Sequence, residues 1–517
     1  MSPAGPEIPR WQGYTSLGLA AAAGAAVMVV ELGVARILTP VFGGSISVWA
    51  IVIATTMLAL AAGYAFGGQR ADRKGGIAVA CRAATIGALL CAAVPWVRLP
   101  LVEATVDLPT LAGAALAAAV LLAPSLFFLG QVSPALIRGL AAGGVTHVGG
   151  TAGGVYAIST MGSLVGTLAA AWLFLYMPLA VGFVGTAALV IVPAMVLRTM
   201  VAIAGAVVLT LAAGLLMAKD TRRVTGMNGF GQRCELVTKH HSPYGELRVV
   251  DQGDVYRYLI VNGADQGGIS LPTGDSAYTF DAGLIALTRL YTEQPRTALV
   301  IGLGAGLISP ILERDGVRVQ VVEIDAEVAR LAREYFGYTG AVFIDDGRRY
   351  LQRSDRAWDA IIVDAFLGGN PPWQLFTAEA FALYAAHLNP QGVVVLNFIG
   401  SHLDPAQRPA LEAVVSTARE VFPTVDVYPH PWESDDYPTR NIFIAAGHHP
   451  RREPPHPGDP EQARSLAAAI ARSTPITVAA GRLLTDDSAP LEPLVRRTTE
   501  ILRSRTRAYL PTDVLFD

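Results

Sequence analysis

The chain has 517 residues, of which 52% are hydrophobic and only 16% are charged. A soluble globular protein usually carries about a quarter charged residues, so this composition excludes an ordinary soluble enzyme as an account of the whole chain. The formal net charge of −3 gives no sign of nucleic-acid binding, and we expect no nucleic-acid partner. The cysteines, Cys81, Cys91 and Cys234, lack the spacing of a metal site or a disulfide framework.

The shortage of charge is concentrated at the N-terminal end, and we expect residues 1–222 to form a multi-pass transmembrane α-helical bundle. A spanning helix needs about 20 apolar residues, and by this rule the chain offers about seven spans. The expected spans are Thr15–Leu38, Val48–Phe66, Ile77–Val97, Pro109–Leu129, Gly153–Tyr176, Leu179–Leu197 and Met200–Ala218. Gly162 and Gly166 form a face of small residues that suits close helix contact. The expected partner of this domain is the lipid bilayer of the cell membrane.

Residues 223–290 read as a small β-domain with a connecting helix. The segments Gly245–Asp251 and Tyr256–Val261 alternate apolar and polar residues, as strands with one buried face do. Asn262-Gly263 is a hairpin-turn signal. We expect a helix over Ala277–Tyr291 to lead into the next domain.

Residues 291–447 alternate apolar strands with helices. Strands are expected at Ala298–Gly302, Val319–Asp325, Ala341–Gly347 and Trp358–Asp364, and a helix at Glu327–Phe336. Strands that are apolar throughout, separated by helices, predict a parallel sheet covered on both faces. The expected fold is an α/β doubly wound, Rossmann-like domain, in which ligands bind at the carboxyl edge of the strands.

The ends of these strands carry the residues that suggest chemistry. Gly302, Gly304 and Gly306 follow the first strand and would let a ligand approach the backbone closely. A glycine-rich turn alone is weak evidence, because such turns also occur for structural reasons. It gains weight from the acids at the following strand ends, which are Glu323, Asp345, Asp346 and Asp364. Glu323 is placed to accept hydrogen bonds from two ribose hydroxyls; the alternative is a solvated strand-end acid.

The order of these motifs resembles that of the polyamine aminopropyltransferase (spermidine synthase) family, within the wider methyltransferase-type fold. The motifs are GLGAG at 302–306, VEID at 322–325, IDDG at 344–347 and VDAF at 363–366. Ser242–Gly245 and Asn262–Gln266 resemble that family's small N-terminal β-domain. The apolar N-terminal part looks like the membrane domain of bacterial fused forms of the family.

The resemblance implies two small-molecule substrates and no metal. One is a co-substrate, which is decarboxylated S-adenosylmethionine or S-adenosylmethionine itself, and the other is an amine. By this match Glu323 would hold the ribose, and Asp346, with Asp345 beside it, the adenine amino group. Gln266 would lie at the mouth of the sheet, and Asp364 would be the catalytic carboxylate beside the attacking amine. Apolar and aromatic walls suit the aliphatic part of an amine. The aromatic candidates are Tyr244, Tyr278 and Trp373. The two tyrosines could equally be packing residues. Trp373 belongs to a Gly- and Pro-rich loop that is a candidate lid.

The chain departs from the family pattern at three acidic positions. Ala305 replaces an Asp of the glycine loop, Tyr278 alone remains of a Tyr-His-Glu triplet, and Leu367 replaces a second Asp. In the family these carboxylates hold the diamine and the aminopropyl group. The loss leaves open an aminopropyltransferase, a methyltransferase-type enzyme, and a transporter or sensor that binds an adenosyl ligand or polyamine without turnover.

Residues 448–517 are expected to form a linker and a C-terminal helical tail. An acidic pair in this region, Asp486 and Asp487, is either a helix cap or solvated loop, or it folds over the site. In the second case Asp487 would supply a missing amine-binding carboxylate.

The orientation in the membrane follows from basic residues. Arg70, Arg73 and Lys74 place the loop after the second span in the cytoplasm, as Arg138 does for the loop after the fourth. These loops follow an even number of spans, so they place the N-terminus in the cytoplasm as well. Seven spans would then place the catalytic domain outside the cytoplasm. Either one span is miscounted or that domain is extracytoplasmic. We favour the cytoplasm, because the adenosyl co-substrate is made there. The resemblance also allows a homodimer.

Overall fold

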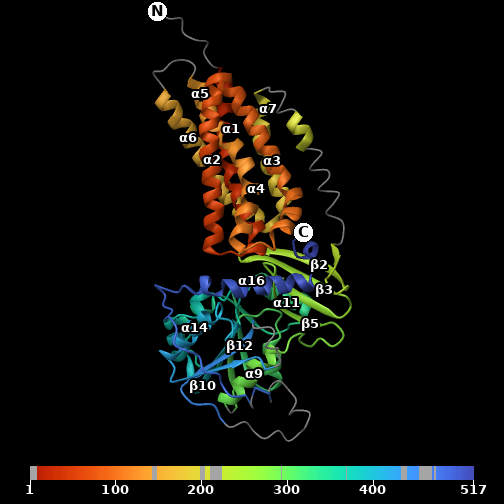
Figure 1. Ribbon diagram of the computed structural model, residues 1–517, viewed down its shortest axis with the longest axis vertical. Coiled ribbons are helices and arrows are strands. Elements are labelled where there is room, and N and C mark those ends of the chain that lie inside the picture. The colour runs from red at the N-terminus through yellow and green to blue at the C-terminus, as the bar shows by residue number, and fades with distance from the viewer. Residues whose placement is uncertain are drawn as a thin grey trace, which may run out of the picture. The chain divides into compact units, whose positions relative to one another are not determined.

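The computed structural model describes residues 9–141, 148–197, 204–209, 224–292, 294–367, 369–431, 439–452, 469–470 and 473–516. The chain divides into two compact units, one from Met1 to Arg223 and the other from Val224 to Leu515, with the last two residues counted with the first (Figure 1).

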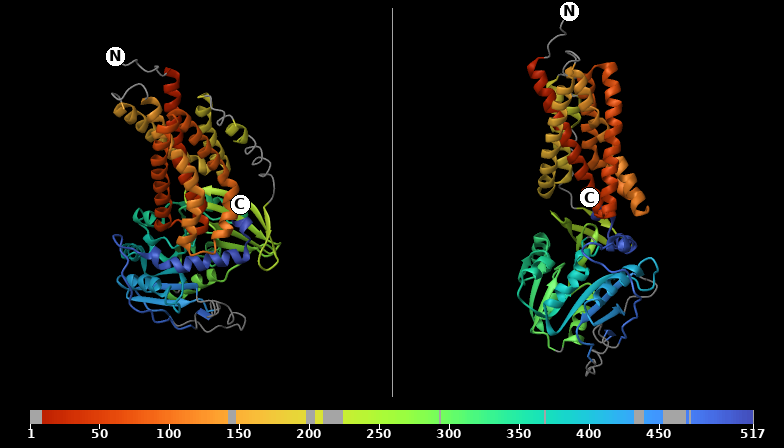
Figure 2. Two further views of the ribbon diagram at one scale, coloured as in Figure 1. Left: turned by 45° about the horizontal axis from the view of Figure 1, so that its top comes forward. Right: turned by 90° about the vertical axis from the view of Figure 1, so that its left-hand side faces the viewer.

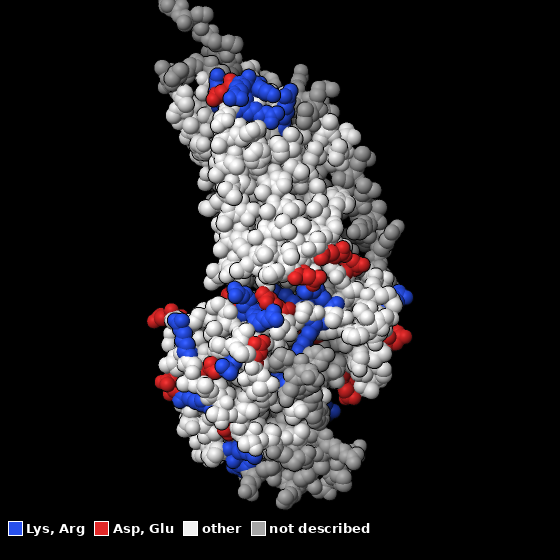
Figure 3. Space-filling view, viewed as in Figure 1, with Lys and Arg blue, Asp and Glu red and all other residues white. Residues whose placement is uncertain are grey.

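The first unit is a bundle of long apolar helices that run side by side (Figure 2). Its helices are α1 (Arg10–Phe42), α2 (Ile46–Lys74), α3 (Gly76–Thr105), α4 (Thr110–Gly130), α5 (Val132–Leu140), α6 (Val148–Tyr176) and α7 (Leu179–Val196). Within the described residues six helices are long and apolar enough to cross a membrane, with α4 and α5 counted as one. The seventh expected span, Met200–Ala218, lies largely outside the described residues. On the face of the bundle seen in Figure 3, a broad band of surface carries no charged side chains.

Small residues let two helices of this bundle touch backbone to backbone. A Cβ added at Gly162 of α6 would overlap the backbone of Ala21 in α1, and one at Gly166 would overlap that of Ala25. Close approach of this kind increases van der Waals packing, which is a main attraction between helices in a bilayer. The small-residue face expected from the sequence is therefore the contact face of α6 with α1.

The second unit begins with a five-stranded antiparallel sheet in which each strand pairs with the next. Its strands are β1 (Thr225–Met227), β2 (Arg233–Ser242), β3 (Gly245–Gln252), β4 (Tyr256–Val261) and β5 (Ala264–Ser270). Asn262 and Gly263, with φ values of 50° and 72°, join β4 to β5. Positive φ at both positions is what a two-residue hairpin turn requires, so the turn signal in the sequence is confirmed.

A seven-stranded sheet follows, in the order β11-β12-β10-β9-β6-β7-β8. Its strands are β6 (Thr297–Ile301), β7 (Arg318–Glu323), β8 (Val342–Ile344), β9 (Trp358–Val363), β10 (Leu388–Gly400), β11 (Thr424–Pro429) and β12 (Arg440–Gly447). The strands from β10 to β8 are parallel, and β12 and β11 are antiparallel to their neighbours. This is the expected Rossmann-like, methyltransferase-type sheet.

Helices cover both faces of this sheet. They are α9 (Phe280–Tyr291), α10 (Ile308–Arg314), α11 (Ala326–Phe336), α12 (Gly347–Gln352), η3 (Trp373–Leu375), α13 (Ala378–Ala386), α14 (Arg408–Arg419) and α16 (Leu491–Tyr509). A last short helix, α17 (Thr512–Phe516), contacts the small sheet, where Arg248 Nη1 donates to the Val514 carbonyl at 2.7 Å. Alternate residues of each strand enter two separate cores, so that Val300 faces the core of α9, α10 and α11, and Leu299 the core of α12, α13, α14 and α16. Burial on both faces explains why the strands are apolar throughout.

Two expected boundaries differ in the structure, and the first differs because of a helix cap. The second parallel strand ends at Glu323 and not at Asp325, because the Asp325 side chain accepts a hydrogen bond from Glu327 N and caps α11. The helix expected from Ala277 begins at Phe280. An N-cap residue leaves the strand conformation and satisfies a free N–H of the helix.

Truncation of a central core residue should test the two-sided burial of β10. Leu396 is fully buried, and Leu396→Ala should lower the free energy of unfolding by about 2–5 kcal/mol through lost burial and a residual cavity. The measurement is guanidinium unfolding of the full-length protein in detergent, followed by tryptophan fluorescence. Leu403 is 48% exposed, and Leu403→Ala is the matched control that should change little. Equal effects of the two variants would contradict the assignment.

Candidate active site

The ends of β6 and β9 meet at the point where the strand order reverses. The chain leaves β6 toward β7 and β8 and returns to the other side of β6 as β9. Gly302 follows β6 and Asp364 follows β9, and the Asp364 N–H donates to the Ile301 carbonyl at 3.0 Å. A Cβ on Gly302, whose φ is +99°, would overlap the carbonyl oxygen of Asp364. Only glycine fits there, and its absence of a side chain brings the expected loop and the expected catalytic acid together.

The other two glycines of the loop make different contacts. A Cβ on Gly304 would lie 2.6 Å from the Gln266 carbonyl oxygen, so Gly304 allows β5 to approach the loop. A Cβ on Gly306 would lie 2.7 Å from the ring of Tyr338, and Gly306 does not border the cavity described next. The loop is therefore fixed on one side by β5 and on the other by Tyr338.

A cavity of about 360 Å³ lies beside this loop within the second unit. This volume is within the range of small-molecule sites. Most of the residues expected at the site border it, namely Tyr244, Gln266, Tyr278, Gly302, Gly304, Glu323, Asp346 and Asp364. They come from the small sheet, the glycine loop and the carboxyl ends of β7, β8 and β9, so one cavity collects the strand-end acids that the sequence singled out.

Glu323 at the end of β7 is buried and is not a solvated acid. Its two carboxylate oxygens accept the backbone N–H groups of Leu303 and Asp325, each at 2.9 Å. Burial raises the pKa of its carboxyl group, and these two hydrogen bonds act in the opposite direction. Besides bordering the cavity, Glu323 thus fixes the conformation of the glycine loop, a role that the sequence did not predict.

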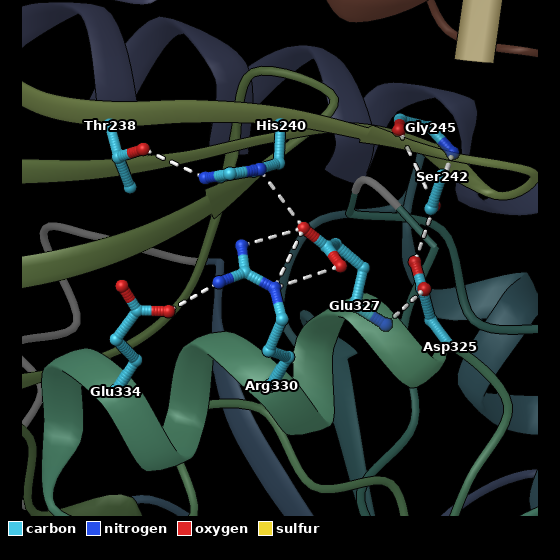
Figure 4. Close-up of polar contacts among 8 residues, drawn as sticks. All are labelled: Thr238, His240, Ser242, Gly245, Asp325, Glu327, Arg330 and Glu334. Atoms are coloured by element: carbon cyan, nitrogen blue, oxygen red, sulfur yellow. Dashed lines mark hydrogen bonds and ion pairs between the residues drawn. The ribbon is translucent and has the colours of Figure 1, made fainter. Parts of the chain in front are cut away.

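Polar contacts between β2 and α11 join the small sheet to the larger one (Figure 4). Ser242 Oγ donates to Asp325 Oδ2 at 2.5 Å and accepts the Tyr244 N–H at 3.1 Å. His240 Nδ1 lies 3.0 Å from Glu327 Oε1 (Figure 4). These contacts hold the turn that carries Tyr244 at the rim of the cavity.

Asp281 is an acid in the cavity that the sequence reasoning missed. It is 3% exposed, and its Oδ2 accepts a hydrogen bond from Ser276 Oγ at 2.6 Å. Burial raises the pKa of Asp281 to about 7; the charge of Asp364 adds to this shift and the Ser276 hydrogen bond reduces it. Asp364 accepts from Asn397 Nδ2 at 2.9 Å, and burial raises its pKa to about 6. Two neighbouring carboxyl groups in one desolvated cavity form a site for a cation or a proton.

Asp265 of β5 is a second missed acid. Its carboxylate accepts hydrogen bonds from Gly267 N at 2.8 Å, from Tyr509 Oη at 2.9 Å, and from Tyr278 Oη. Burial raises its pKa to about 6. Asp265 borders the cavity together with Asp281 and Asp364.

The long helix α16, close to the C-terminus, also reaches the cavity. Leu502, Arg505, Thr506 and Tyr509 border it. The sequence predicted a helical tail but gave no reason to place it at the site. Asp281 did have a local signal, since it is the single acid in an otherwise apolar helical segment and follows Tyr278 by three residues.

Four expected site residues do not border the cavity, namely Gly306, Asp345, Trp373 and Asp487. Asp345 forms an ion pair with Arg349. Trp373 is 41% exposed, although its neighbours Pro372 and Gln374 border the cavity. These placements correct the expectation that Asp345 and Trp373 line the ligand site.

The acidic pair near the C-terminus has a structural role. Asp486 accepts hydrogen bonds from Arg348 Nη1 at 2.7 Å and Thr377 Oγ1 at 2.8 Å, and the contact with Arg348 lowers its pKa. Asp487 is exposed. Neither residue folds over the cavity, so the alternative interpretation, a polar turn, describes this segment.

Comparison with known proteins gives a consistent picture. Residues 282–432 match the family model described as spermine/spermidine synthase domain. The chain is 32% identical over 209 residues to a polyamine aminopropyltransferase of Moorella thermoacetica. The aligned region covers 37% of this chain and 72% of that protein. It is 29% identical over 210 residues to a probable polyamine aminopropyl transferase of Bifidobacterium longum, covering 39% of this chain and 46% of that protein.

The extent of these similarities differs among the relatives. The chain spans less than half the length of the Bifidobacterium protein, and about a quarter to a half of two other curated relatives. The crystal structure of spermidine synthase from Thermotoga maritima matches with a TM-score of 0.36 and 18% identity, over 51% of this chain and 89% of that chain.

The buried acids should make the stability of the protein depend on pH. The pKa of Asp281 is raised from 3.8 to about 7 in the folded state, so folding favours its protonated form. The free energy of unfolding should therefore fall as the pH rises from about 4 to about 7. Asp281→Asn removes this loss and should raise the melting temperature at pH 8 by roughly 2–4 °C more than at pH 5.

Thermal unfolding of the full-length protein at the two pH values measures this difference. Asp275, which is exposed in the turn before α9, provides the matched control Asp275→Asn, for which no pH-dependent gain is expected. A change in melting temperature that is the same at both pH values would contradict the buried, raised-pKa assignment of Asp281.

Proposed function

Because the chain belongs to the polyamine aminopropyltransferase family, we propose that its second unit transfers an aminopropyl group from decarboxylated S-adenosylmethionine to a polyamine or a related amine. The observation that carries the proposal is the position of Asp364, with Asp281 beside it, at the switch point of the sheet next to the glycine loop. Acids at this point suit a reaction in which a cation loses a proton before it attacks.

The proposed nucleoside site uses the strand-end residues around the glycine loop. Glu323 and Asp346 border the cavity from the ends of β7 and β8, as acceptors for the ribose hydroxyls and the adenine amino group. Gly302 and Gly304 give the ligand access to the backbone, and Gln266 borders the cavity from β5. The cavity volume of about 360 Å³ supports a ligand of this size.

The proposed reaction needs few catalytic groups. An amine is protonated in water and has no lone pair for attack, so Asp364 accepts or relays a proton from it. The neutral nitrogen then attacks the carbon next to the sulfonium sulfur. A C–N bond forms, the C–S bond breaks, and 5′-methylthioadenosine leaves with a neutral sulfur. The extra proton on the new secondary amine goes to solvent, directly or through Asp364. Holding the two reactants in line supplies much of the acceleration.

The raised pKa values suit this role. A carboxyl group with a pKa of about 6 or 7 exchanges protons near neutral pH more readily than one with the ordinary value near 4. Asp281 would balance the charge of a cationic amine next to Asp364. Tyr244, Tyr278 and Phe280 border the same cavity and would contact the aliphatic part of the amine.

We further propose that the protein is a multi-pass protein of the cell membrane with its catalytic unit in the cytoplasm. The six apolar helices support insertion in a bilayer. Arg138 of α5 and Asp72 of α2 form an ion pair at 3.0 Å, so the basic ends of α2 and α5 lie at the same end of the bundle. Basic residues gathered at one end favour the cytoplasmic side for that end.

Methyl transfer is the competing activity, because intact S-adenosylmethionine carries the same nucleoside and sulfonium. Purified full-length protein should be incubated with decarboxylated or intact S-adenosylmethionine and a panel of diamines and polyamines. We expect 5′-methylthioadenosine and an aminopropylated amine from the decarboxylated compound. A methylated amine with S-adenosylhomocysteine would replace the proposal by methyl transfer, and binding of the decarboxylated compound without product would favour a sensor.

The role of Asp364 is tested by Asp364→Asn, which keeps the shape and removes the proton acceptor. The rate constant kcat should fall at least about 100-fold, the usual contribution of a positioned acid or base. Binding of 5′-methylthioadenosine, measured by calorimetry, should stay within about twofold. The exposed Asp254 in the turn between β3 and β4 provides the control Asp254→Asn, which should retain full activity. A fully active Asp364→Asn enzyme would remove Asp364 from the mechanism.

A further inference from the structure

The glycine loop carries no acid of its own where it faces β5. Ala305 is buried at 3% exposure, and a Cβ placed on Gly267 of β5 would lie 3.1 Å from the Ala305 Cβ. The loop and the strand are therefore in direct contact at this point, and Ala305 also borders the cavity.

The contacts of the glycine loop show that it runs across the cavity from Asp364 to β5. Its first glycine, Gly302, touches Asp364, and Gly304 then approaches the carbonyl of Gln266. Ala305 next approaches Gly267. A ligand arm that starts beside Asp364 and follows the loop thus ends against β5.

Asp265 presents a carboxylate at that end. It precedes Gly267 by two residues in the same strand, at an irregularity in the pairing of β5 with β4. Its Oδ1 accepts the Gly267 N–H at 2.8 Å, which turns the carboxylate toward the part of β5 that faces Ala305. Asp265 borders the cavity there.

The carboxylate of Asp265 is held by neutral donors from three segments. The donors are the backbone of Gly267, the hydroxyl of Tyr278 and the hydroxyl of Tyr509 in α16. Neutral donors orient a carboxylate without cancelling its charge. A carboxylate has about four lone-pair positions, and three donors leave one for a ligand.

We propose that Asp265 binds the terminal ammonium of the aminopropyl arm of the co-substrate and selects the decarboxylated compound over intact S-adenosylmethionine. This inference rests on the proposed function. In the decarboxylated compound the arm ends in an ammonium alone, which pairs with Asp265 in a charge-assisted hydrogen bond. In the intact compound a carboxylate sits on the same carbon as the ammonium. It is repelled by Asp265 in a cavity where charges are weakly screened.

The test compares three ligands on the full-length protein by calorimetry, namely decarboxylated S-adenosylmethionine, S-adenosylmethionine and 5′-methylthioadenosine. The last has the nucleoside and sulfur but no charged arm. Asp265→Asn should weaken binding of the decarboxylated compound about 10- to 100-fold, the value of a charged hydrogen bond. It should leave 5′-methylthioadenosine within about twofold and lower the preference for the decarboxylated over the intact compound by a similar 10- to 100-fold factor.

Two further variants separate this role from a structural one. Tyr509→Phe keeps the ring and removes one donor, and it should weaken only the decarboxylated compound, by a smaller factor. The exposed Asp254 gives the control Asp254→Asn, which should change none of the three affinities.

Each other outcome overturns the inference in a recognisable way. Equal weakening of the decarboxylated compound and 5′-methylthioadenosine would make Asp265 a structural residue. Unchanged affinity for the decarboxylated compound with a raised KM for the amine would assign Asp265 to the acceptor. In both cases the proposed function stands. A wild-type protein that binds none of the three ligands would overturn the proposed function as well.

Discussion

The structure depends on the contact between Gly302 and the carbonyl of Asp364. The parallel pairing of β6 with β9 brings two segments more than 60 residues apart in the chain to one point. A side chain at position 302 would overlap the Asp364 backbone, so the contact exists only with glycine there. Glu323 completes it by accepting the Leu303 N–H from the next strand. The loop is thus held from both sides, and the position of Asp364 is fixed relative to the proposed nucleoside site by this backbone contact and by the Glu323 carboxylate.

The buried acids of the cavity lower the stability of the free protein, although the proposed chemistry needs them. Asp265, Asp281 and Asp364 all have raised pKa values because burial disfavours their charged forms. Their hydrogen bonds come from hydroxyl, amide and backbone donors, including Ser276, Asn397 and Gly267. Such donors orient the acids but leave most of the cost of desolvation in place. The cationic amine proposed as the substrate would supply the missing countercharge, and the desolvation of these acids in the free protein would then favour the binding of cations.

The sequence was sufficient for those parts of the site that local pattern determines. Gly302, Glu323, Asp346 and Asp364 stand at the ends of apolar strands, and in a parallel sheet all such ends lie at one edge. The sheet itself follows from strands apolar on both faces. Boundaries were less certain, because the Asp325 cap ends β7 two residues before the acidic motif ends.

The remaining residues depend on contacts between distant segments. Tyr509 lies 244 positions from Asp265, and no periodicity in the tail indicates that α16 reaches the cavity. Asp486 and Asp487 looked suitable because they are acidic and late in the chain, yet Asp486 is bound by Arg348 and Thr377. Charge and position in the sequence could not separate an acid that borders the cavity from one that holds a turn, since only the packing distinguishes them.

Ala305 lies where the glycine loop packs against β5. A Cβ on Gly267 would lie 3.1 Å from the Ala305 Cβ, so the loop and the strand are in contact there. The same closeness places Asp265 at the edge of the loop, held by the Gly267 N–H. Where the loop has no acid, the facing strand therefore carries one, and Ala305 and Asp265 border the same cavity. Under the proposal made above, Asp265 of β5 takes the place of the carboxylate that the family's glycine loop supplies. The acids that border the cavity then indicate its ligand better than the sequence of the loop does.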